Sequence, residues 1–176
     1  GGAAAAAAAR AARQTGSAKD KWGPLSEALK AAERVVKWEY DPVKNDWIKT
    51  ATLVTVDSAP FAEGGFRLAY HMRDLSDCTT SFVAKVVKKP VARDVYLDEI
   101  KMQVVAQQWA EKFNAFSPPK KVSFITPYFV EFIERKKDSD KKQCAVERLI
   151  DGPYRKYNNN SGFVTGIDER NTPQAF

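Results

Sequence analysis

Residues 60–87 read PFAEGGFRLAYHMRDLSDCTTSFVAKVV. After the paired glycines, Phe66, Leu68, Tyr70 and Met72 alternate with other residues, which is the period of a strand with one apolar face. Ser81–Val87 has the same β-branched texture, and polar residues separate the two runs. This stretch therefore predicts two antiparallel strands preceded by a glycine-containing turn.

The flanking sequence extends this pattern in both directions. Apolar residues recur at spacings of three and four between Pro90 and Phe116, which predicts one long amphipathic helix that ends at the prolines after Ser117. Asp94 stands where an N-cap or first-turn acid belongs. Further strands are predicted at Trp47–Asp57, Val122–Ile133 and Cys144–Ile150. The fold class is α+β, an antiparallel sheet of about five strands with one long helix.

The beginning of the chain differs in composition from the rest. Residues 1–34 are rich in alanine and arginine, with seven consecutive alanines at Ala3–Ala9, and we interpret them as a flexible tail. A targeting peptide is the alternative for this acid-poor stretch. A short helix is predicted from Ser26 to about Val36. The folded domain is expected to occupy residues 35–176.

Composition excludes several classes of protein. The 176 residues carry a formal charge of +6 that is not concentrated in one segment, and the ten phenylalanines follow strand and helix patterns, so a nucleic-acid binder is disfavoured. Two cysteines and one histidine in no cluster argue against a zinc site. The cysteines fit free thiols in a reducing, cytoplasmic compartment better than a disulfide. No apolar run is long enough to span a membrane.

Two features within residues 60–87 suggest nucleotide chemistry. Glycines in the turn 62–67 would let backbone N–H groups approach a phosphate, and Arg67 could reach it with its guanidinium group. Lys85 shares a strand face with Val83 and Val87, where a charge needs a partner such as a phosphate or a helix carboxylate. The alternatives are an ordinary hairpin and a lysine that extends to water.

The junction after the last predicted strand is the third feature. Residues 146–152 read VERLIDG, and backbone groups at such a junction could hydrogen-bond a purine between apolar side chains. A plain strand end is the alternative. The order along the chain is glycine turn, strand lysine, long helix, strand and junction, which is the order in the small lobe of a protein kinase.

The wording of several stretches resembles the α-type protein serine/threonine kinases, the family of the myosin heavy chain kinases and elongation-factor-2 kinases. The matching stretches are PFAEGGFR (60–67), FVAK (82–85), RDVYLDEIKMQVVAQQWAEKFN (93–114), VERLIDGPYRKYNNNSGFV (146–164) and TPQAF (172–176). The resemblance covers about Val35 to Phe176.

The resemblance implies an ATP-dependent, Mg²⁺-using transfer of phosphate to Ser or Thr of protein substrates. It implies that the hairpin covers the phosphates, that Lys85 contacts them and is required for transfer, and that backbone groups at the junction hold the adenine. The implied ATP-binding residues are Ala62, Glu63, Gly64, Gly65, Arg67, Lys85, Glu147, Leu149 and Ile150, with Lys85 as the catalytic residue and no metal ligand.

The family continues past TPQAF into a larger lobe that supplies the metal-holding and catalytic acids and a zinc site. We therefore expect these residues to form the N-terminal lobe alone, with little activity by themselves and an exposed apolar face around Tyr154, Phe163 and Phe176. The rival interpretations are a pseudokinase or an interaction module without catalysis. A further hypothesis pairs Lys85 with Asp98 or, preferably, Glu99 of the long helix.

Overall fold

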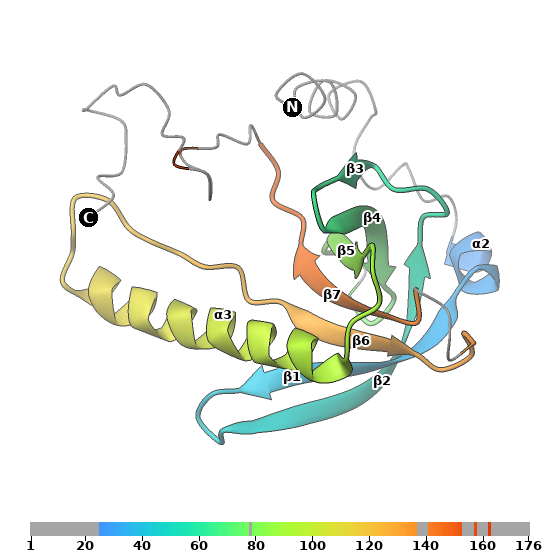
Figure 1. Ribbon diagram of the computed structural model, residues 1–176, viewed down its shortest axis with the longest axis horizontal. Helices are drawn as coiled ribbons and strands as arrows, with labels where there is room; N and C mark the ends of the chain where they lie inside the picture. The colour runs from blue at the N-terminus through green and yellow to red at the C-terminus, as the bar shows by residue number, and fades with distance from the viewer. Residues whose placement is uncertain (1–24, 78, 137–140, 153–156, 158–161, 163–176) are drawn as a thin grey trace.

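The computed structural model describes residues 25–77, 79–136, 141–152, 157 and 162 (Figure 1). One sheet runs through all of the strands, and every pairing in it is antiparallel. The order of the sheet is β2-β1-β6-β7-β5-β4-β3. The elements are α2 (Leu25–Lys30), β1 (Glu33–Asp41), β2 (Asp46–Val56), β3 (Ala62–Glu63), β4 (Arg67–Asp74), β5 (Phe82–Val87), α3 (Arg93–Ala115), β6 (Tyr128–Phe132) and β7 (Gln143–Arg148).

The sheet closes on itself. The outer edge of β4 pairs with β3 through Leu68 and Ala69 and with β2 through residues 72–74, so that the strand order returns to β2. Alternation then divides each strand between an interior and an exterior face. The interior is filled by Val35, Val54, Tyr70, Met72, Phe82, Ala84, Val86, Tyr128, Val130, Phe132, Cys144 and Val146.

The long helix α3 covers part of the exterior face. Figure 1 shows it running beside β6 and β1, and it contacts β1, β6 and β7. Tyr96 and Ile100 are 1% exposed and pack on Phe129 and Ala145 of the sheet. Because alternation sends Phe82, Ala84 and Val86 of β5 to the interior, it places Lys85 on the exterior face, the side that α3 covers. The predicted α+β class and the predicted helix are confirmed, although the sheet has seven strands where about five are predicted.

The predicted helix at 26–36 is wrong beyond Lys30. Residues 33–41 instead form β1, which the sequence indicated only as a strand end near Lys37–Tyr40. Val35 lies in the barrel interior and Trp38 on the exterior face, so the alternation of a strand replaces the helical spacing. Of the predicted tail, residues 1–24 lie outside the described residues.

The predicted strand at 122–133 is also shorter than expected. Only Tyr128–Phe132 is a strand, and residues 121–127 are extended without a ladder. Asn114 of α3 holds this segment by donating to the Val122 carbonyl (2.6 Å) and accepting from the Val122 N–H (2.9 Å). Asp94 lies in the first turn of α3, whose N-cap is Ala92 without a side-chain bond.

The second half of α3 leaves its apolar residues exposed. Trp109 and Phe113 are 65% and 49% exposed, and with Val122 and Phe124 they line an apolar hollow of about 380 Å³. Phe66, expected on the apolar face of its strand, precedes β4 and is 87% exposed. The apolar face expected around Tyr154, Phe163 and Phe176 lies outside the described residues.

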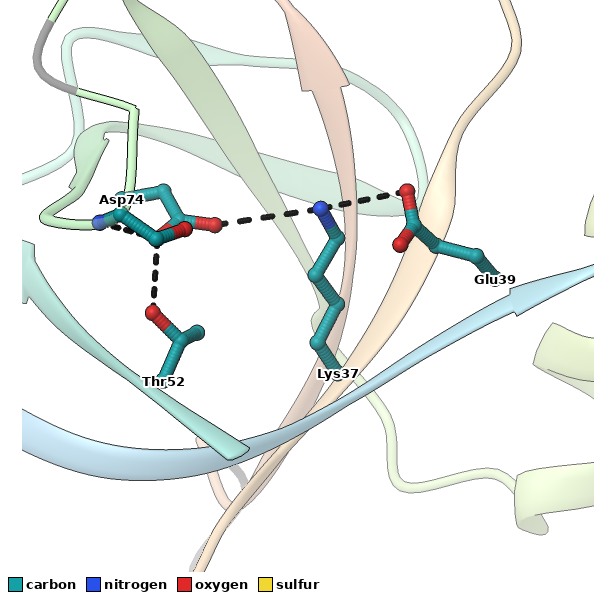
Figure 2. A network of polar contacts seen from close by, with 5 residues as sticks. Lys37, Glu39, Thr52 and Asp74 are labelled. Carbon is teal, nitrogen blue, oxygen red and sulfur yellow. Dashed lines mark hydrogen bonds and ion pairs between the residues drawn. The ribbon is translucent and has the colours of Figure 1, made fainter. Parts of the chain in front are cut away.

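A polar cluster occupies the interior face where β1, β2 and β4 meet (Figure 2). Asp74 is 1% exposed, and its Oδ1 accepts from Thr52 Oγ1 (2.8 Å), from the Ser76 N–H (2.9 Å) and from Ser76 Oγ (2.6 Å). Lys37 Nζ lies between two carboxylates, 3.1 Å from Glu39 Oε1 and 3.9 Å from Asp74 Oδ2. These contacts satisfy a charged group that would otherwise be costly to bury.

Candidate functional site

The turn between β3 and β4 is a tight hairpin with an open tip. The Gly64 N–H donates to the Arg67 carbonyl at 2.8 Å, which leaves Gly65 and Phe66 as the two loop residues. Neither glycine has a positive φ. A Cβ added at Gly65 would meet nothing within 4 Å. Neither backbone strain nor packing among the described residues therefore requires Gly65, and the space beside it is open to a ligand.

The hairpin is tied to the end of β5. The Lys88 N–H donates to the Phe66 carbonyl at 2.9 Å, and Lys88 Nζ forms an ion pair with Glu63. Ala62 pairs with Ala69 across the hairpin. Glu63 is thus placed at the edge of the hairpin, where its carboxylate faces the cation of Lys88.

Lys85 lies in the middle of β5 between two small residues. Its cross-strand neighbours are Ala69 on β4 and Ala145 on β7, which leave room around its side chain. Lys85 Nζ forms an ion pair with Glu147 Oε1, and the two side chains are 33% and 16% exposed. Lys85 therefore does not extend into bulk solvent, and its charge is held on the exterior face of the sheet.

Arg67 begins β4 opposite Val87, two residues along the ladder from Lys85. Its Nη2 donates to Glu99 Oε2 of α3, and both side chains are about a third exposed. The hypothesis that Glu99 pairs with Lys85 is therefore wrong in its partner. Glu147 is diagonal to Lys85 in the ladder and forms the ion pair with it. Glu99 of the helix pairs with Arg67 instead.

Tyr96 of α3 contacts the sheet beside the Arg67–Glu99 ion pair. It is 1% exposed, and its Oη accepts from the Val87 N–H at 3.4 Å. Burial raises the pKa of Tyr96, and the Val87 N–H opposes that shift, so the phenol stays neutral. The sequence identified Tyr96 only as a core position. It gave no sign of the hydroxyl contact.

The junction after β7 contains an exposed apolar side chain and a backbone N–H that already has a hydrogen-bond partner. The Leu149 N–H donates to the Ser81 carbonyl at 2.8 Å, so this donor is already used. Ile150 is 69% exposed. The side chain of Glu147 points to the helix side of the sheet, a role that sequence analysis missed because it considered only backbone groups there. Strand alternation from the buried Ala145 could have indicated it.

Four charged groups thus gather on one face: Arg67, Lys85, Glu99 and Glu147. Their formal charges cancel in two ion pairs. The hollow along α3 and the hollow beside Arg135 both lie away from this face. Partial exposure leaves both cations accessible to an anionic ligand.

The described residues form neither a cluster of metal ligands nor a helix that could span a membrane. They contain no group of three His, Cys, Asp or Glu side chains placed to hold a metal ion. Mg²⁺ bound with a nucleotide needs only one or two protein carboxylates, and those of this face, Glu99 and Glu147, are both engaged by cations. None of the helices within 25–152 that the structure describes has the length and apolar character to cross a bilayer.

Comparisons with known proteins agree with this geometry. The model of the alpha-kinase family matches residues 62–176. The chain is 51% identical over 152 residues to myosin heavy chain kinase B of Dictyostelium discoideum, covering 84% of this chain and 20% of that protein. It is 33% identical over 165 residues to human eukaryotic elongation factor 2 kinase, covering 89% of this chain and 22% of that protein.

Solved structures give the same result. The α-kinase domain of myosin heavy chain kinase A in complex with ATP superimposes with a TM-score of 0.69 at 31% identity, covering 77% of this chain and 69% of that chain. The complex of that domain with AMP-PNP also gives 0.69 at 31% identity, with 77% and 67% covered. The chain spans about a fifth of the length of the curated relatives quoted above. It belongs to the alpha-kinase family.

Proposed function

We propose that this chain provides the ATP-binding part of a protein serine/threonine kinase, which transfers the γ-phosphate of ATP to hydroxyl groups of protein substrates. A relative that shares its fold, the α-kinase domain of myosin heavy chain kinase A, was solved with ATP and with AMP-PNP bound. The observation that carries the proposal is the pairing of a glycine hairpin with two cations, Arg67 and Lys85, on adjacent strands of one face.

The two cations suit the charge of a nucleotide. Phosphoryl transfer requires positioning and electrostatic stabilisation more than covalent chemistry. Lys85 has ammonium protons beyond the one directed at Glu147, and a guanidinium group carries five N–H donors, of which the Glu99 contact uses one. Phosphate oxygens could therefore bind both cations while the ion pairs remain in place.

The remaining residues would position the rest of the nucleotide. Ala62, Glu63, Gly64 and Gly65 form the hairpin whose open side, beside Gly65, would face the phosphates. The adenine would lie against the junction formed by Glu147, Leu149 and Ile150. Since the Leu149 N–H is used by Ser81, the purine contacts are assigned to the other backbone groups of this junction.

Magnesium supplies charge neutralisation when it is bound with ATP in such enzymes. Glu99 and Glu147 are each paired with a cation, so neither carboxylate is assigned to the metal. We expect the 176-residue polypeptide to bind nucleotide and to transfer little phosphate by itself. The ion pairing of both carboxylates favours the second candidate, a nucleotide-binding or interaction module without catalysis.

Two measurements on the polypeptide separate these functions. Isothermal titration with adenosine, ADP and ATP should show affinity that increases with the number of phosphates. A radiolabelled-phosphate assay with a protein acceptor should then show little turnover. Failure to bind any nucleotide would contradict the proposed function, and rapid metal-dependent turnover would contradict the expectation that this polypeptide transfers little phosphate.

A further inference from the structure

We propose that Glu99 is a positioning residue that fixes the guanidinium group of Arg67 at the nucleotide phosphates. This inference rests on the proposed function and adds a residue to the site. The ion pair joins α3 to the first residue of β4, immediately after the glycine hairpin. Glu99 therefore connects the position of the helix to the group that would meet the phosphates.

Glu99 is held in place by its neighbours on α3. Tyr96 and Ile100, three residues before it and one after it, are each 1% exposed and pack into the cluster beneath the helix. Tyr96 and Ile100 are four residues apart and therefore lie on the same face of the helix, with Glu99 beside it. Rotation of α3 about its axis would expose both side chains, so the backbone position of Glu99 is fixed, and the ion pair with Arg67 holds its carboxylate.

A second contact between α3 and the sheet lies next to the Arg67–Glu99 ion pair. Tyr96 Oη accepts from the Val87 N–H at 3.4 Å, and Val87 is the cross-strand neighbour of Arg67. The two contacts hold neighbouring strands to one turn of α3. One contact is to β4 and the other to β5, so together they fix the distance between the helix and the base of the hairpin.

Arg67 retains donors for a second ligand. Its Nη2 binds Glu99, whereas Nε and Nη1 have no hydrogen-bond partner within the portion of the chain that the structure describes. A planar guanidinium can hold a carboxylate on one edge and a phosphate on another. Fixing one edge lowers the conformational entropy that the long side chain would lose on binding phosphate.

Two possible roles of Glu99, competing with phosphate for Arg67 and positioning Arg67, predict opposite changes in ATP affinity when its charge is removed. If Glu99 only competed with phosphate for Arg67, removing its charge would tighten ATP binding. If Glu99 positions Arg67, the loss of its charge should weaken ATP binding although the face becomes more positive. Adenosine, which has no phosphate, is the reference ligand in both cases.

The experiment is isothermal titration of the 176-residue polypeptide with ATP and with adenosine. The variants are Glu99→Gln, Glu99→Asp and the matched control Asp98→Asn, an exposed acid on the same turn of α3. Glu99→Gln is expected to lower the preference for ATP over adenosine by about fivefold or more, a part of one charge-assisted hydrogen bond. Glu99→Asp should retain more of that preference, and Asp98→Asn should match the wild type.

Three results would overturn the inference. They are tighter ATP binding by Glu99→Gln, an equal loss of ATP and adenosine affinity, which indicates a purely structural role, and affinities for ATP and adenosine that both equal those of the wild type. In each of these the wild type still binds ATP, so the proposed function survives. A wild type that binds no nucleotide overturns the proposed function and this inference with it.

Discussion

Replacing Asp74 by alanine should destabilise the fold and leave nucleotide affinity unchanged. Asp74 is 1% exposed and lies in the polar cluster of Figure 2, on the interior face of the sheet. Lys85 lies on the exterior face. The substitution removes the acceptor of the bonds from Thr52 and Ser76 and one of the two carboxylates beside Lys37.

The size of the effect follows from what each partner can recover. Ser76 is exposed and can bond to water, and Lys37 keeps Glu39 at 3.1 Å. For the ion pair with Lys37 alone, the loss is therefore less than the 3–5 kcal/mol typical of removing one partner from a buried pair that has no substitute. Together with the half-buried Thr52 hydroxyl, we expect about 3 kcal/mol, or about 10 °C in Tm for a domain of this size. Asp74→Asn keeps one acceptor oxygen and should fall between the variant and the wild type.

Thermal unfolding followed by circular dichroism measures the change, and titration with ATP below the transition measures the site. Asp98→Ala, which removes an exposed acid, should stay within about 0.5 kcal/mol of the wild type. An Asp74→Ala protein as stable as the wild type would refute the assignment of the cluster as structural. A lower ATP affinity in a folded Asp74→Ala protein would refute the separation of the two faces.

Three further predictions concern the hairpin, a surface turn and a buried thiol. Gly65→Ala places a Cβ in open space, so its Tm should equal or slightly exceed that of the wild type while its ATP affinity falls about fivefold; equal affinity would remove the hairpin from the site. Hydrogen bonds to its carboxylate, of which that from the Thr79 hydroxyl has the largest effect, lower the pKa of Asp77 from 3.8 to about 2. This carboxylate therefore stabilises the fold above pH 4, and the stability is lost between about pH 4 and pH 2. Acid titration of Asp77→Asn should show a shallower loss of Tm in that window, and an identical profile would contradict the assignment. Burial raises the pKa of the Cys144 thiol to about 12, so iodoacetamide at pH 8.5 should label the Cys144 peptide only after denaturation; rapid labelling of the native chain would contradict its burial.

The sequence predicted those elements whose signals are local. The long helix was predicted from its spacing and its terminating prolines, and β5 from its β-branched alternation around Lys85. β1 was largely missed because Val35 and Val36 also fit a helical spacing. Its interior face contains Lys37, a charged residue whose burial depends on the distant Asp74.

The ion-pair partners could not be predicted because they depend on the register between strands. Lys85 meets Glu147 rather than Glu99 since β7 pairs with β5, a contact between segments about 60 residues apart in sequence. The apolar spacing of α3 likewise identified a face at Trp109 and Phe113 without showing whether another element covers it. Packing between distant segments decides both features.

The most direct test of the account is the contribution of Lys85 to ATP affinity. Titration with ATP and adenosine should compare the wild type, Lys85→Met and Lys89→Met, in which an exposed lysine four residues away loses the same charge. We predict that Lys85→Met lowers ATP affinity about tenfold or more, the loss of one charge-assisted hydrogen bond, with adenosine affinity unchanged. Equal ATP affinity in the wild type and both variants would contradict the claim that this strand lysine binds the phosphates of a nucleotide.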